Sequence, residues 1–122
     1  MDLREFYDRT DGDFEGAMQR FSKEERVAKF VRMFPNDPCC EELESCLAKN
    51  DVKGAFRAVH TLKGVCLNLS FSGLYKSVYE VTEALRHADP ENVEDMERVH
   101  TGMESLRRDY DAVIQAVRGL DT

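Results

Sequence analysis

The stretch that decides the fold runs from Asp51 to Leu69 and reads DVKGAFRAVHTLKGVCLNL. Its apolar residues recur mostly in steps of three and four, the spacing that places them on one face of an α-helix. Asp51 stands directly before this pattern, where its carboxylate can accept a hydrogen bond from a free backbone N–H of the first turn. The sequence therefore predicts an amphipathic helix whose buried stripe consists of Val52, Ala55, Phe56, Val59, Leu62, Cys66 and Leu69.

The same spacing continues toward the N-terminus. It predicts two short helices, at residues 3–7 and 14–21, separated by an Asp-Gly-Asp turn at residues 11–13. Ser22 followed by Glu25 matches a capping box, in which each side chain hydrogen-bonds to a free backbone N–H of the other residue. We therefore expect the third helix to begin after Ser22, and a fourth helix to follow Pro38 and run to about Lys49.

The C-terminal half is predicted to hold two further long helices. One carries the apolar residues from Phe71 to Leu85, and the other begins at Asp89-Pro90 and continues to Leu120. No alternating strand pattern interrupts them. The predicted fold class is all-α, an up-and-down antiparallel four-helix bundle with short N-terminal helices. We expect a single domain over residues 1–122, with an N-terminal helical extension at 1–21 and the bundle at about 22–118.

Composition limits the possible partners. The chain has 17 Lys and Arg against 24 Asp and Glu, a net charge of −7, which argues against nucleic-acid binding because that affinity comes mainly from cations on phosphates. The acidic N-terminus does not resemble a signal peptide, and no run approaches the roughly 20 apolar residues of a membrane span. We therefore expect a cytoplasmic protein that binds neither nucleic acid nor membrane.

The four cysteines favour reduced thiols over a disulfide framework or a metal site. Cys39, Cys46 and Cys66 take core positions in their helices, and no paired C-x-x-C spacing occurs. Cys40 falls outside its stripe, so we expect it to be exposed. The sequence predicts no metal ligands.

Of the three histidines, His87 and His100 are expected to be surface residues, the first at a helix end and the second among acids. His60 differs from them. Because an α-helix turns by 100° per residue, His60 points away from the apolar stripe of its helix. Basic residues and a glycine share its face or flank it, together with one apolar residue off the stripe: Lys53, Arg57, Lys63, Gly64 and Leu67.

This histidine face has the composition of a site for a negatively charged group. Residues 52–69 contain three cations and no acid, whereas the rest of the chain holds 14 bases and 24 acids. A glycine inside a helix lowers its stability by about 1 kcal/mol relative to alanine, so the presence of Gly64 calls for an explanation. One explanation is that the missing side chain leaves room for a partner. Leu67 is an apolar residue outside the buried stripe, which suggests that this face is a contact surface. The alternative, a merely solvated polar face, is weakened by the segregation of acids away from this helix.

Residues 58–64, AVHTLKG, with Asn68 eight positions after His60, closely resemble the signature of histidine-containing phosphotransfer (HPt) domains. About residues 24–118 fit the four-helix layout of that family. Two positions depart from its pattern, since Ser70 stands where the family often has Gly and Leu67 where it commonly has a small residue.

The resemblance implies a phosphoryl carrier of a two-component phosphorelay, not a turnover enzyme. His60 would accept a phosphoryl group from a receiver-domain phospho-aspartate and pass it to an aspartate of another receiver, and Lys63 would stabilise the phosphoryl oxygens. The partner-binding residues would be Gly64, Arg57, Lys53, Leu67 and Asn68. The implied partners are response-regulator receivers, a hybrid histidine kinase, or both, with the chain itself a monomer. No cofactor is implied here, because the magnesium ion belongs to the receiver.

Two other functions compete with this one. A binding module of the same fold could dock a receiver or another signalling protein without carrying phosphate, although the presence of both His60 and Lys63 disfavours it. A helical enzyme is disfavoured more strongly, because no cluster of acid-base or metal-binding residues is evident. The bundle fills the chain, so we expect the phosphoryl donor and acceptor to be other proteins.

Overall fold

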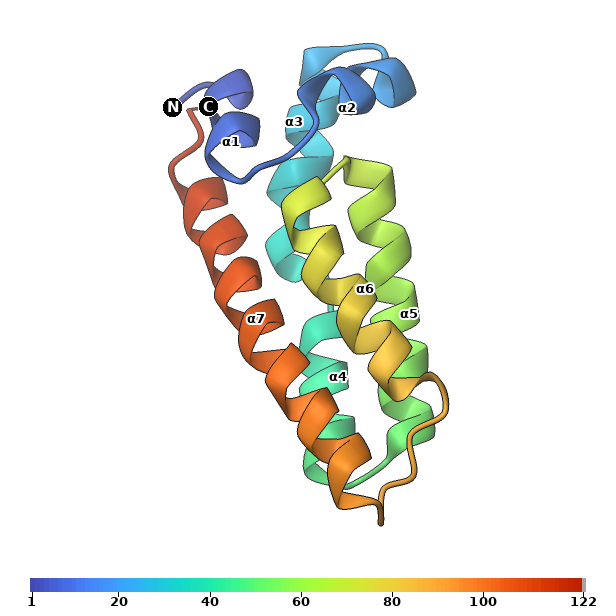
Figure 1. Cartoon of the computed structure of the whole chain (residues 1–122). Helices are drawn as coiled ribbons and strands as arrows, with labels where there is room; N and C mark the ends of the chain where they lie inside the picture. Colours follow the sequence, from blue (N-terminus) through green and yellow to red (C-terminus); the bar gives the residue numbers. More distant parts are fainter. Residues whose placement is uncertain (122) are drawn as a thin grey trace.

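Helices make up all the regular structure in residues 1–121, the part of the chain that the computed structural model describes (Figure 1). The predicted all-α class is therefore confirmed. The elements, in chain order, are α1 (Leu3–Arg9), α2 (Phe14–Phe21), α3 (Glu24–Met33), the 3-10 turn η1 (Phe34–Asn36), α4 (Cys39–Ala48), α5 (Val52–Leu69), α6 (Ser72–Arg86) and α7 (Val93–Arg118).

The long helices pack in chain order. α4 packs on α5, α5 on α6, and α6 on α7, while η1 joins α3 to α4 so that the two lie roughly end to end (Figure 1). The two chain ends meet beside α1. There the Met1 ammonium donates to the Gly119 carbonyl at 2.8 Å, and the Asp121 N–H donates to the Met1 carbonyl at 2.9 Å. No helix in residues 1–121 combines the length and the apolar character that a membrane crossing requires.

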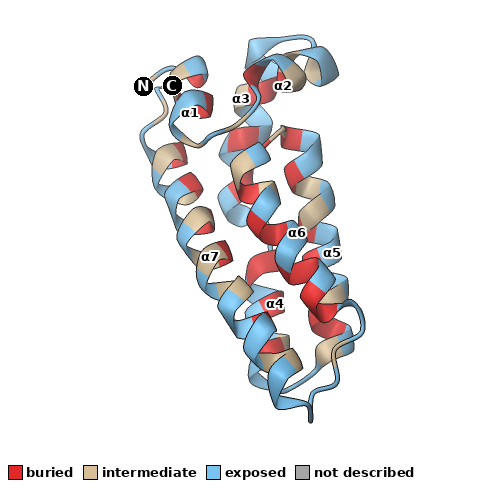
Figure 2. Cartoon of the chain, in the orientation of Figure 1, coloured by how far each residue is buried: buried red, intermediate tan, exposed pale blue. Residues whose placement is uncertain are grey.

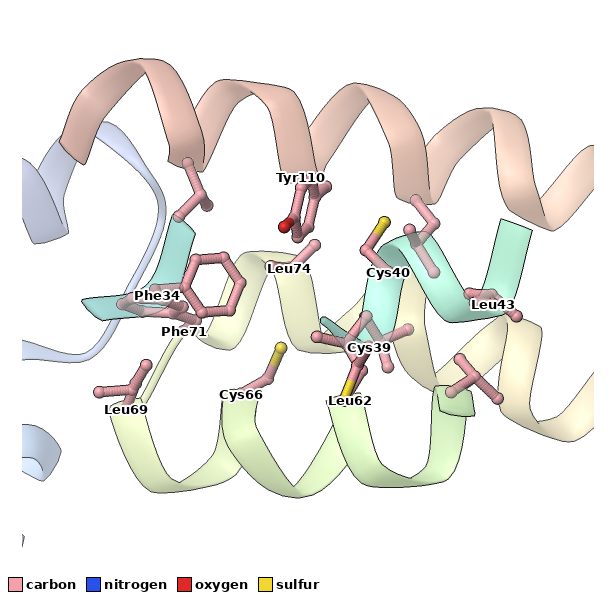
Figure 3. Packing of buried hydrophobic residues seen from close by; sticks show 14 of the residues in the cluster. Phe34, Cys39, Cys40, Leu43, Leu62, Cys66, Leu69, Phe71, Leu74 and Tyr110 are labelled. Atoms are coloured by element: carbon pink, nitrogen blue, oxygen red, sulfur yellow. The ribbon is translucent and has the colours of Figure 1, made fainter. Parts of the chain in front are cut away.

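The inner face of α5 lies at the centre of the core. Ala55, Val59, Leu62, Cys66 and Leu69 are buried there, as the apolar stripe predicted, whereas Val52 and Phe56 are only half-buried. Figure 2 shows how buried and exposed segments alternate along α5. Toward the C-terminal end of α5 the core becomes aromatic, because Phe71 meets Phe34 at 5.2 Å between ring centroids and Phe34 meets Tyr110 at 5.5 Å (Figure 3).

The two N-terminal helices cover the end of the bundle where α5 passes into α6. The buried Tyr7 hydroxyl of α1 donates to the Leu69 carbonyl at 2.7 Å, and the Asp13 N–H donates to the Ser70 carbonyl at 2.8 Å. The Gly73 N–H of α6 in turn donates to the Asp11 carbonyl at 2.9 Å. These bonds hold the C-terminal end of α5 in place.

Some predicted helix ends are confirmed and others are wrong. Asp51 caps α5 as predicted, its carboxylate accepting from the Gly54 N–H at 2.9 Å. Ser22 does not begin α3, because it ends α2 in the left-handed conformation, with φ of 70°, and Lys23 takes the N-cap position instead. The last helix begins at Val93 and not at Asp89-Pro90. Asn92 caps it by accepting from the Asp95 N–H at 2.9 Å.

Cys40 is buried, contrary to the prediction that it is exposed. α7 provides the cover, because the Arg107 guanidinium donates to the Cys40 sulfur at 3.6 Å and also pairs with Glu44 and Asp111. The thiol of Cys40 itself donates to Glu44 at 3.6 Å. A stripe counted along α4 alone could not reveal this second packing partner.

Candidate functional site

The outer face of α5 presents His60 to solvent. Lys53, Arg57, Gly64 and Leu67 lie exposed on the same side, whereas Ala55, Val59, Leu62 and Cys66 on the opposite side are buried. The Asp51 cap holds the start of this helix, and the bonds from Tyr7 to Leu69 and from Asp13 to Ser70 hold its end. The helix thus offers a firm support on which one exposed imidazole is displayed.

The three cations of this face are not paired with carboxylates of the described chain. Lys53 and Arg57 are exposed and Lys63 is half-buried. Within residues 1–121 none of the three forms an ion pair with a carboxylate. An approaching anion would therefore meet cations that no internal partner has already neutralised.

Gly64 lies one turn after His60 and faces open space. A methyl group added to its backbone would meet no atom within 4 Å outside its own helical surroundings. Its backbone conformation is also not one that favours glycine, since no glycine of the described chain has a positive φ. The fold therefore does not require glycine here, and the free space remains for an external group.

Leu67 and Asn68 extend the face toward α2 and α3. Leu67 is 49% exposed, and its carbonyl accepts a hydrogen bond from Arg20 of α2. Asn68 borders a groove of about 540 Å³ whose apolar walls include Phe21 and Phe30. The predicted partner-binding residues are thus all exposed along one side of α5, from Lys53 near its start to Asn68 near its end.

Two residues near this face, Phe56 beside His60 and Arg86 beside Phe56, were not predicted as site residues. The ring of Phe56, one turn earlier on α5, stacks on the imidazole at 5.8 Å between centroids and 20° between planes. The Arg86 guanidinium of α6 lies 5.3 Å from the centre of the Phe56 ring. The four-residue spacing could have indicated Phe56, but Arg86 comes from another helix and has no such signal.

α6 also brings an acid near the histidine face. Glu83 accepts hydrogen bonds from Arg86 Nε at 3.2 Å and Nη2 at 2.9 Å. These bonds lower the pKa of Glu83, and the nearby charges of Arg86, Lys63 and His87 act in the same direction. The absence of acids along α5 therefore does not extend to the neighbouring helix.

The remaining histidines and the cysteines offer no competing site. His87 ends α6 and is exposed, and His100 is exposed on α7, as predicted. Burial raises the pKa of Cys66 to about 12, so its thiol stays protonated at neutral pH. Within residues 1–121, no group of three or more His, Cys, Asp or Glu side chains is arranged to hold a metal ion.

Comparison with known proteins identifies the family. A search of curated proteins and a search of solved structures each found no significant match. The family model described as "Hpt domain" matches residues 30–116, which include the last turn of α3, η1, all of α4, α5 and α6, and most of α7. His60 and its exposed face lie inside the matched region. The chain belongs to the Hpt domain family, whose members act in histidine phosphotransfer of two-component phosphorelays.

Proposed function

We propose that this protein carries a phosphoryl group on His60 between two receiver domains. The observation that supports this most directly is the environment of His60, the one histidine on an exposed, cation-lined helix face inside the family match. His87 is the C-cap of α6 and His100 lies on α7, so neither is part of the cation-lined face of α5.

The transfer is a displacement at phosphorus. The lone pair of a His60 ring nitrogen attacks the phosphorus of an aspartyl phosphate, and the new N–P bond forms as the P–O bond to aspartate breaks. The aspartate leaves as a carboxylate with the bonding electron pair, while the other ring nitrogen of His60 keeps its proton. Such transfer depends mainly on positioning and charge stabilisation, which a single nucleophile on a rigid helix can supply.

We assign the cations of α5 two different roles. Lys63, three residues after His60 and without an ion-pair partner among residues 1–121, stabilises the phosphoryl oxygens. Lys53 and Arg57 attract the acidic active site of a receiver. Magnesium is held by that receiver, so this chain needs no cofactor.

The docking surface consists of the exposed positions around the histidine. Gly64 gives the partner backbone room, and Leu67 and Asn68 extend the contact toward α2 and α3. The pairwise packing of α4 through α7 supports an up-and-down four-helix bundle as the frame of this surface. The partners are receivers of response regulators or of a hybrid histidine kinase, and the carrier acts as a monomer in the cytoplasm.

The decisive experiment mixes the protein with a receiver phosphorylated with labelled phosphate. We expect label on this chain that is lost in acid and stable in base, as an N–P bond requires. His60→Gln should abolish the label, whereas the matched control His87→Gln should keep it at the wild-type level. Persistent label on His60→Gln would contradict the assignment.

The alternative of a binding module without phosphate has its own signature. In that case the protein would bind receivers, as measured by calorimetry or a pull-down with purified domains, but no receiver would label it. Failure of labelling across the receivers of its own genome, with binding retained, would replace the carrier function by this one.

A further inference from the structure

Three side chains on two helices form a stack that includes the reactive histidine. The His60 imidazole lies nearly parallel to the Phe56 ring, and the Arg86 guanidinium lies against that same ring. We propose that Phe56 and Arg86 are positioning residues, which hold the His60 ring so that one of its nitrogens faces the incoming phosphoryl group. This inference rests on the proposed phosphoryl transfer.

Phe56 is suited to orient the imidazole because it is itself held in place. It is half-buried and packs against the hydrophobic core from the same helix, one turn before His60. An exposed histidine otherwise rotates broadly about its terminal side-chain bond. The near-parallel arrangement at 20° restricts this rotation before a partner arrives, so less freedom is lost when phosphorus and nitrogen align.

Arg86 connects this arrangement to α6. Its guanidinium is held by Glu83 through two hydrogen bonds of 2.9 and 3.2 Å. Its cationic carbon lies 5.3 Å from the Phe56 ring centre, within the range of a cation–π contact. Glu83 thus restrains the guanidinium, and we assign Arg86 a role through its contact with the Phe56 ring.

A purely structural role for this stack makes a different prediction. Aromatic pairs four residues apart stabilise helices modestly, so Phe56 could support α5 without affecting the chemistry. A structural role predicts that Phe56→Leu lowers stability but leaves the reaction of His60 unchanged in the folded protein. A positioning role predicts a slower reaction at conditions where the variant is fully folded.

The test uses the full chain and the small phosphodonor phosphoramidate, which needs no docking surface. We expect Phe56→Leu to slow labelling of His60 by about two- to tenfold, the effect of freeing one rotatable side chain, and Phe56→Tyr to restore the rate. In NMR spectra, the ring protons of His60 should lose their ring-current shift in Phe56→Leu and keep it in Phe56→Tyr.

Phe30→Leu is the matched control, because Phe30 is also partly exposed and stacked on another ring, Phe21, but lies on α3. It should change neither the His60 spectrum nor the rate. Equal labelling rates for wild type and Phe56→Leu would overturn the inference while leaving the carrier function intact. If wild type takes no label on His60 from a phosphorylated receiver either, the carrier function fails, even where the ring-current shift shows that the stack exists.

Arg86 is tested separately. Arg86→Gln should slow labelling about twofold and broaden the His60 ring signals, whereas Arg98→Gln, which removes a comparable pair three residues apart on α7, should do neither. An unchanged rate and spectrum in Arg86→Gln would remove Arg86 from the proposal.

Discussion

The two faces of α5 belong to one helix but obey different constraints. On the inner face, Val59 and Leu62 are completely buried, so their identity is set by packing. On the outer face, His60 is exposed and Gly64 has open space where a side chain would be. Packing in the core does not determine which residues occupy the outer face. Its cations, its glycine and its exposed leucine are therefore better explained by an interaction with another molecule. The comparison separates residues that maintain the helix from residues that it displays.

The largest expected effect tests this separation directly. Leu62→Ala should lower the free energy of unfolding by about 2–5 kcal/mol, because it leaves a cavity in a fully buried site. His60→Gln, only two residues away, should change it by less than about 0.5 kcal/mol, as exposed positions usually do. Urea titrations followed by circular dichroism give both values. A comparable loss in the two variants would mean that the faces are not energetically distinct.

A second expectation concerns alkaline pH. Burial raises the pKa of the Cys66 thiol to about 12, above that of an unfolded cysteine at about 8.5. The protonated thiol is favoured in the folded state, so its contribution to stability is complete below pH 8.5 and declines as the pH rises toward 12.

Denaturant titrations between pH 8 and 12 measure this loss. Cys66→Ala should be less stable than wild type at neutral pH. Above pH 9 its stability should fall less steeply, because alanine has no thiol whose deprotonation would destabilise the folded state. The outer-face variant His60→Gln should keep the wild-type slope. An identical slope in Cys66→Ala would show that this thiol is not protected by the inner face.

Helix content could be predicted from the sequence, but some helix ends could not. The spacing of apolar residues indicated α1, α2 and α5 because one buried stripe is a property of a single helix. Ser22 met the residue pattern of an N-cap, yet the reversal between α2 and α3 places it in the left-handed conformation that ends α2. Both roles suit the same local sequence, and tertiary packing decides between them.

The site shows the same limit. The exposure of His60 and of its neighbours on α5 follows from 100° per residue, so it could be predicted from one helix alone. Arg86 and Glu83 enter through the packing of α6 on α5, and the burial of Cys40 through the packing of α7 on α4. Contacts between helices depend on their relative rotation, which periodicity within each helix does not determine.

A small effect on stability is expected at Gly64, where two substitutions should differ in their effect on phosphoryl transfer. Gly64→Ala should raise the free energy of unfolding by up to about 1 kcal/mol, because the added methyl meets nothing and the unfolded chain becomes less flexible. Gly64→Gln should also fold, but it should slow transfer from a phosphorylated receiver by blocking close approach. Ala112→Gln, an exposed position on α7, should transfer at the wild-type rate.

Rapid-quench measurements with the receiver, compared with phosphoramidate labelling, separate obstruction of a protein partner from damage to His60 itself. Obstruction slows the receiver reaction much more than the reaction with the small donor. Wild-type receiver rates in Gly64→Gln would mean that the open space beside His60 is not used for docking. The outer face would then hold a glycine that neither the fold nor the partner requires, and the distinction between the two faces of α5 would fail at this position.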